Sequence, residues 1–112
     1  MTNIFIMALF FHWLGDFVLQ TNSMATNKST SNKWLFIHVL IYTAVISTLG
    51  FKYAIINGAA HIIIDYVTSR CSSYFYKKKD IHNFFVVIGL DQFLHVSLLF
   101  LTVEYISPVW VV

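Results

Sequence analysis

Charged residues are scarce in this chain. Asp, Glu, Lys and Arg make up 11% of its 112 residues, whereas soluble domains average about 25%. Hydrophobic residues make up 58% of the chain, and the mean hydropathy is +0.72. A globule of this size buries only part of its surface, so the apolar surplus indicates that the chain folds in lipid.

Proline, glycine and cysteine are also scarce. One Pro and four Gly exclude a collagen-like or low-complexity disordered chain. The single Cys71 excludes an intramolecular disulfide and a Cys-based metal motif. The net charge of +2 is too small to indicate nucleic-acid binding. The first residues carry no basic segment, so we expect no cleavable signal peptide.

Four apolar segments are long enough to be membrane spans, since a spanning helix needs about 20 predominantly apolar residues and roughly 17 are tolerated. They cover residues 4–20, 34–51, 53–70 and 83–107. The third carries Asn57, His61 and Asp65, which must face protein or water rather than lipid. Pro108 is expected to end the last helix. We therefore predict an all-α fold, a single domain over residues 1–112 that forms a membrane-embedded bundle of four transmembrane helices.

The basic residues indicate an orientation. Those near the first and third connections are Lys28, Lys33, Arg70, Lys77, Lys78 and Lys79, whereas the second connection carries only Lys52. Positive residues favour the cytoplasmic side. We expect loops 21–33 and 71–82 to be cytoplasmic and both termini to lie across the membrane. Membrane lipid is the expected partner, and a homo-oligomer is compatible with so small a chain.

Three His/Asp pairs with four-residue spacing lie within the apolar segments: His12–Asp16, His61–Asp65 and Asp91–His95. Positions four apart share a face of a helix, so each pair presents an imidazole and a carboxyl in one direction. Counted along antiparallel spans, the three pairs and His38 all lie roughly 6 to 18 Å below the same interface. Several helices are therefore expected to direct polar side chains at one shared place.

Imidazole and carboxylate are common ligands of zinc, manganese and iron, so the pattern predicts a divalent metal site near the cytoplasmic face. His12, His61, His95 and Asp91 are the first candidates as ligands. Asp16, Asp65 and His38 are ligands or orient them, and Asp16 and Asp65 are candidate catalytic bases. The same residues suit a structural polar network or a proton relay, and these alternatives stay open. Cys71 and Glu104 receive no predicted role.

The strings HWLGDFVLQT (12–21), NGAAHIIIDYVTSR (57–70) and DQFLH (91–95) resemble a family of small bacterial and phage membrane proteins catalogued as domain of unknown function 3307. The resemblance covers roughly residues 4–100 and implies a compact helical protein of the bacterial inner membrane. It assigns no activity. The motifs are also loosely similar to those of predicted membrane-bound metal-dependent hydrolases.

Two functions from different classes fit these observations. The first is a metal-dependent hydrolase that acts on an ester or phosphoester, with a lipid-linked or phosphorylated substrate at the membrane face. The second is a non-catalytic phage or bacterial membrane factor, binding a partner or resembling a holin, whose His/Asp pairs only stabilise the bundle. Metal content distinguishes the two.

Overall fold

The computed structural model describes residues 2–105, which contain helices and no strand. The elements are α1 (Thr2–Trp13), a π-helical turn (Leu14–Val18), α2 (Asn22–Asn27), α3 (Asn32–Ile46), a 3-10 turn (Ser47–Leu49), α4 (Phe51–Lys77), α5 (Ile81–Leu101) and a last 3-10 turn (Val103–Tyr105). The all-α prediction is confirmed for this part of the chain. Pro108 lies outside the described residues.

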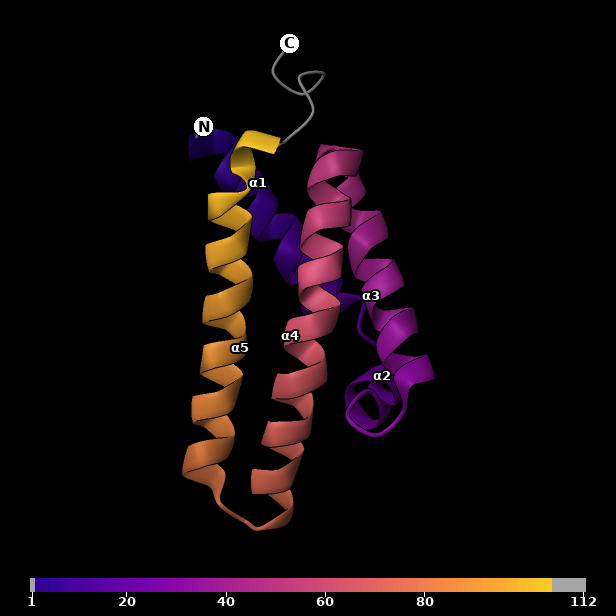
Figure 1. Cartoon of the computed structure of the whole chain (residues 1–112), viewed down its shortest axis with the longest axis vertical. Coiled ribbons are helices and arrows are strands. Elements are labelled where there is room, and N and C mark those ends of the chain that lie inside the picture. The colour runs from indigo at the N-terminus through magenta and orange to yellow at the C-terminus, as the bar shows by residue number, and fades with distance from the viewer. Residues whose placement is uncertain (1, 106–112) are drawn as a thin grey trace.

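The long helices form an elongated bundle of about 50 × 26 × 20 Å. Figure 1 shows α4 and α5 as an antiparallel pair, with α3 on the other side of α4 and α1 crossing obliquely behind. The start of α1 and the end of α5 lie at one end, and the turn between α4 and α5 lies at the other. The helix bounds show that the apolar segments 4–20, 34–51, 53–70 and 83–107 are each helical over most of their length.

Two of these helical segments are long and apolar enough to cross a membrane. Asn32–Leu49 has a mean hydropathy of 1.3, and Ile81–Leu101 has one of 2.0, whereas the apolar stretch Asn3–Val18 is shorter. Helix α4 is long enough to cross a membrane, but its polar residues make it too polar to count as a candidate span. A bundle of four spans stays a prediction.

The predicted loop boundaries were wrong in two places. The segment 71–82 is mostly helical, because α4 continues to Lys77 and α5 begins at Ile81. The segment 21–33 contains α2 and the start of α3. The physical reason is that a helix can continue beyond its apolar stretch, because Ser, Tyr and Lys are acceptable helix residues. A fall in hydropathy therefore does not mark the end of the helix here.

Local signals at the connections explain where the helices start. Gly50 has a φ of 146° between α3 and α4, a conformation that glycine adopts without a steric penalty. Asp80 begins α5 by accepting hydrogen bonds from the backbone and side chain of Asn83. These bonds stabilise the carboxylate and lower the pKa of Asp80. Thr21 caps α2 by accepting from the backbone of Met24.

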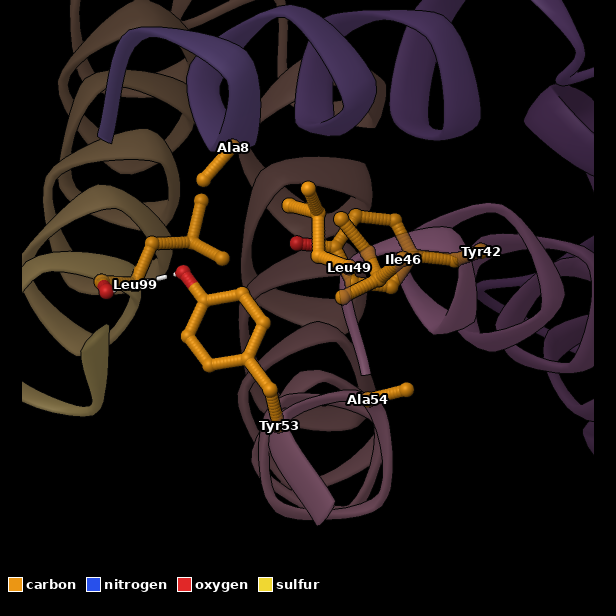
Figure 2. Packing of buried hydrophobic residues seen from close by; sticks show 7 residues of the cluster. All are labelled: Ala8, Tyr42, Ile46, Leu49, Tyr53, Ala54 and Leu99. Carbon is orange, nitrogen blue, oxygen red and sulfur yellow. Dashed lines mark hydrogen bonds between the residues drawn. The ribbon is translucent and has the colours of Figure 1, made fainter. Parts of the chain in front are cut away.

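A small apolar core lies near the turn between α3 and α4 (Figure 2). It consists of Ala8, Tyr42, Ile46, Leu49, Tyr53, Ala54 and Leu99. Tyr53 donates its hydroxyl to the carbonyl of Leu99 at 2.9 Å, which ties α4 to α5. This core fixes the helices at one end and leaves the middle of the bundle to polar side chains.

The buried part of the described chain is unusually rich in polar side chains. The buried residues include as many polar as apolar side chains, ten of each among the described residues. Phe51, Ile63, Phe93 and Leu101 are at least 66% exposed and belong to a much larger set of exposed apolar side chains. An apolar exterior around a polar interior is the pattern of a helical bundle in lipid.

Candidate metal centre

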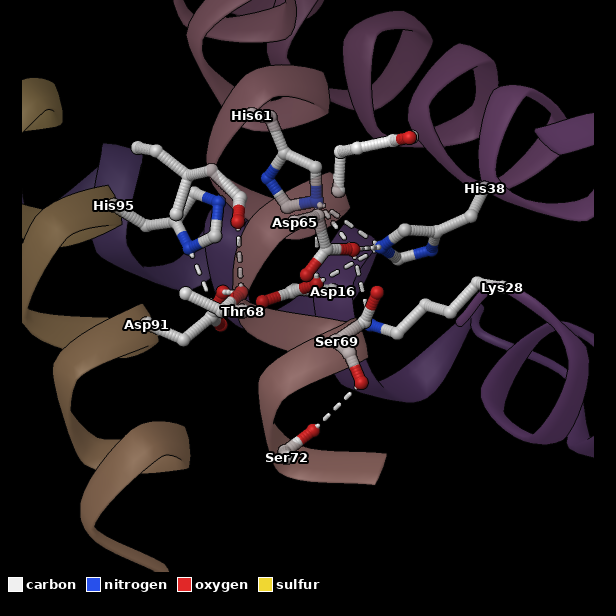
Figure 3. A network of polar contacts seen from close by, with 12 residues as sticks. Asp16, Lys28, His38, His61, Asp65, Thr68, Ser69, Ser72, Asp91 and His95 are labelled. Atoms are coloured by element: carbon white, nitrogen blue, oxygen red, sulfur yellow. Dashed lines mark hydrogen bonds and ion pairs between the residues drawn. The ribbon is translucent and has the colours of Figure 1, made fainter. Parts of the chain in front are cut away.

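The structure brings together the predicted polar side chains in the middle of the bundle, and Figure 3 labels all of them except His12. All seven are at most 8% exposed. Within the three pairs, the closest nitrogen–oxygen distances are 3.9 Å for His12–Asp16, 3.6 Å for His61–Asp65 and 3.4 Å for Asp91–His95. The predicted convergence on one place is therefore observed. Cys71 and Glu104 are exposed, and neither belongs to this cluster.

Asp16, His38 and His61 form a group that could hold a metal ion. His38 Nε2 lies 3.0 Å from Asp16 Oδ1 and 3.1 Å from His61 Nε2, and His61 Nε2 lies 3.6 Å from Asp16 Oδ1. A tetrahedral ion with ligands at about 2.0–2.1 Å separates its ligand atoms by about 3.3 Å. The three observed separations bracket that value, so the donor atoms are already at metal-site spacing.

The two histidines are poorly satisfied by protein alone. Each imidazole carries one N–H when neutral, and the Nδ1 atoms of both His38 and His61 are buried without a hydrogen-bond partner among the described residues. Whichever tautomers are present, a buried ring nitrogen is left unpaired, at a cost of about 1–3 kcal/mol. The Nε2 atoms of His38 and His61 lie 3.1 Å apart, and a cation between them would accept both lone pairs. These residues therefore fit a metal ion.

Asp65 lies beside this group and is held by a lysine. Its Oδ2 is 3.5 Å from His38 Nε2 and 3.6 Å from His61 Nε2, and it accepts a 3.0 Å hydrogen bond from Lys28 Nζ. Among residues 2–105, Asp16, Asp65 and Asp91 are buried, and Lys28 is the lysine that pairs with one of them. When the imidazoles are neutral, the cluster has an excess of negative charge that a divalent ion would compensate.

A second group, Asp16, Asp91 and His95, lies next to the first and could also hold a metal ion. Thr68 donates to Asp91 Oδ1 at 2.5 Å, and Gln92 Nε2 donates to Asp91 Oδ2 at 3.0 Å and to Asp16 Oδ2 at 3.1 Å. The ring of His95 packs against that of His61 with centroids 4.1 Å apart. Asp16 is common to both groups.

The structure does not bring His12 into either group. Both of its ring nitrogens are hydrogen-bonded, Nδ1 to the Tyr42 hydroxyl and Nε2 to Gln92 Oε1, each at 2.9 Å. A nitrogen that is already paired is not available to a metal without rearrangement. The contacts of His12 are those of a residue that orients Gln92 and Tyr42.

Comparison with known families gives one result. The family model described as "Protein of unknown function (DUF3307)" matches residues 4–110. The chain belongs to this family. No curated protein and no solved structure matches it. Membership in this family agrees with the resemblance of the three His/Asp motifs and assigns no activity.

A pocket of about 510 Å³ leads to the polar cluster of this DUF3307 chain. Asp16, Asp65 and Asp91 line it, together with residues of α2, α4 and α5. Hydroxyl side chains line much of it: Thr26, Ser29, Thr68, Ser69, Ser72 and Ser73. Apolar side chains line the rest: Phe17, Ala25, Phe84, Val87 and Ile88, together with the ring of Tyr76.

Three site residues have observed roles that the sequence does not predict. Lys28 is predicted only to mark the topology, and its position in a polar connection gives no signal that it reaches Asp65. Gln92 follows Asp91 by one position, about 100° around the helix, yet its amide contacts Asp91, Asp16 and His12. Thr68 receives no predicted role, although it lies three residues after Asp65 and therefore near the same helical face.

Proposed function

We propose that this chain is a membrane-embedded, metal-dependent hydrolase of an ester or phosphoester group carried by an amphiphilic molecule. The observation that carries the proposal is the pocket lined by Asp16, Asp65 and Asp91, beside buried imidazoles at metal-site spacing. Pockets of about 300–1,000 Å³ with a few convergent polar groups are typical of small-molecule sites.

The metal would be zinc, manganese or iron in the divalent state, held by Asp16, His38 and His61. Once bound, such an ion lowers the pKa of water and polarises a substrate oxygen. Asp65 lines the pocket, and its carboxylate lies within 3.6 Å of the Nε2 atoms of His38 and His61. It could therefore accept the proton of an attacking water. Lys28 holds that carboxylate in position and supplies a positive charge beside the pocket.

The pocket lining supports an amphiphilic substrate. Ser69 Oγ and Gln20 Oε1 are buried without a hydrogen-bond partner among residues 2–105, and both residues line the pocket. Buried polar atoms of this kind normally have a partner, so a polar head group is their natural complement. The apolar wall formed by Phe84, Val87 and Ile88 on α5 suits a hydrocarbon chain.

The orientation and location form part of the proposal. We place the chain in the bacterial inner membrane as a multi-pass protein, with the segments 21–33 and 71–82 on the cytoplasmic side. The exposed apolar side chains and the two candidate spans support a membrane location. The basic residues of these two segments support the orientation.

The test is hydrolysis by the purified chain in detergent after loading with zinc or manganese. Lipids that carry a phosphomonoester, a phosphodiester or a carboxylic ester would be offered beside water-soluble counterparts. We expect hydrolysis of at least one lipid, loss of activity in His61→Gln and Asp65→Asn, and retention in His82→Gln, because His82 is exposed on the first turn of α5. No hydrolysis by the metal-loaded chain, or full activity of His61→Gln, would contradict the proposal.

The competing function is a non-catalytic membrane factor whose polar cluster stabilises the bundle. The hydrogen bonds of His12 and the Lys28–Asp65 ion pair favour it locally, because both link different parts of the chain without a metal. In that case the purified chain would contain no stoichiometric metal, and His61→Ala and Asp91→Ala variants would keep their biological activity.

A further inference from the structure

The carboxylate of Asp16 lies between two sets of potential ligands. Its Oδ1 faces the imidazoles of His38 and His61, at 3.0 and 3.6 Å. Its Oδ2 faces the other way and accepts from Gln92 Nε2 at 3.1 Å. The two oxygens of one carboxylate thus face different neighbours, which is the arrangement of a carboxylate that bridges two metal ions.

His95 supplies an independent observation. It is 3% exposed, and both of its ring nitrogens are buried without a hydrogen-bond partner among the described residues. Its Nδ1 lies 3.4 Å from Asp91 Oδ2. A buried imidazole with neither nitrogen hydrogen-bonded is rare, and a ligand between His95, Asp91 and Asp16 would satisfy it.

We propose that the site binds two divalent metal ions, with Asp16 as the bridging carboxylate. The first ion would take Asp16, His38 and His61, and the second would take Asp16, Asp91 and His95. The two donor groups share Asp16 and lie side by side, as carboxylate-bridged ions about 3.5–4 Å apart require. This inference rests on the metal centre of the proposed function and adds a second ion to it.

Gln92 occupies the gap that the second ion would enter. Its amide nitrogen donates to Asp16 Oδ2 and Asp91 Oδ2, and its amide oxygen accepts from His12. A neutral N–H group that joins two carboxylates is a weak substitute for a cation. The second ion therefore displaces the amide nitrogen of Gln92 from both oxygens.

Charge narrows the substrate class. With neutral imidazoles, two divalent ions outweigh the three carboxylates, and Lys28 adds a further positive charge beside the pocket. A centre with a positive excess favours an anionic phosphate group over a neutral carboxylic ester. The two-ion centre thus selects the phosphoester from the two substrate classes of the proposed function.

The experiment is titration of the purified chain with Mn²⁺, with free Mn²⁺ measured by electron paramagnetic resonance. We expect two ions per wild-type chain, with magnetic coupling between them, and one uncoupled ion in His95→Gln and in Asp91→Asn. His82→Gln, the matched histidine control, should bind two. Inorganic phosphate should bind the Mn²⁺-loaded wild type about tenfold more tightly than loaded His95→Gln. Two variants are used so that misfolding of one does not decide the result.

The possible failures are distinguishable. One ion per wild-type chain, or two ions in both His95→Gln and Asp91→Asn, would overturn the bridged pair and leave a metal centre in place. Equal phosphate affinity in the one-ion and two-ion forms would overturn the preference for a phosphoester. The absence of any bound Mn²⁺ would overturn both this inference and the proposed function.

Discussion

At the scale of single residues, the site contains an ion pair between Lys28 and Asp65. The side chain of Lys28 is 17% exposed and that of Asp65 is 2% exposed, and their charged atoms are 3.0 Å apart. Removing one partner of a buried pair leaves an uncompensated charge and is far more costly than removing both. Lys28 therefore stabilises the fold through Asp65, whatever chemistry the site performs.

We expect Lys28→Met to lower the free energy of unfolding by about 3 kcal/mol, because Asp65 keeps a buried charge without its partner. The double variant Lys28→Met with Asp65→Asn should lose clearly less than the sum of the single losses. Thermal unfolding in detergent with a metal chelator measures these changes. A negligible effect of Lys28→Met, or strictly additive losses, would show that the ion pair is not formed.

Some residues of this site can be predicted from the sequence, and others cannot. His12, His61, Asp91 and their partners are predictable because four-residue spacing on a helix places two side chains on one face, which depends only on helix geometry. The contacts of Lys28 and Gln92 depend on how separate segments pack, and no local spacing carries that information. The sequence therefore indicates the cluster but not the positions of Lys28 and Gln92 in it.

At the scale of the elements, the π-helical turn at Leu14–Val18 is not predictable from periodicity. Asp16 lies within it, and the His12–Asp16 pair, which begins in α1, is the longest of the three pairs at 3.9 Å. Gly15 lies in the same turn, where a Cβ would be 3.2 Å from the Tyr42 ring. Single π-turns inside helices are often found at functional sites, and this one presents the carboxylate of Asp16 to both donor groups.

The spacing of α3 and α4 depends on Gly58. A Cβ at this position would collide with the side chain of Thr43 on α3, so the two helices that carry His38 and His61 can approach closely only with glycine there. A Cβ added at Gly89 on α5 would instead meet no neighbouring side chain. The two glycines therefore make a matched pair, one at a close contact and one in open space.

Gly58→Ala should destabilise the bundle by about 1–3 kcal/mol, because the added methyl group overpacks the contact with Thr43. Gly89→Ala should be neutral or stabilising by up to about 1 kcal/mol, since alanine is the better helix former. Thermal melting of both variants, monitored by circular dichroism, compares them directly. Equal effects at the two positions would contradict the close approach of α3 and α4.

At the scale of the whole molecule, the chain is polar in its middle and apolar outside. Composition predicts the helical class, because lipid forces every backbone group to be satisfied within helices. Hydropathy fails at the end of α4, where helix continues past the apolar stretch to Lys77. Buried polar side chains in an apolar environment must satisfy one another or hold an ion.

The most direct test of the central claim is the metal content of the chain as purified in detergent without added metal. Elemental analysis should find zinc, manganese or iron at one or two ions per wild-type chain. We expect the same content in His82→Gln and a clear loss in a variant that combines His38→Gln with His61→Gln. A wild-type chain without stoichiometric metal, or a double variant that keeps the full content, would contradict the account.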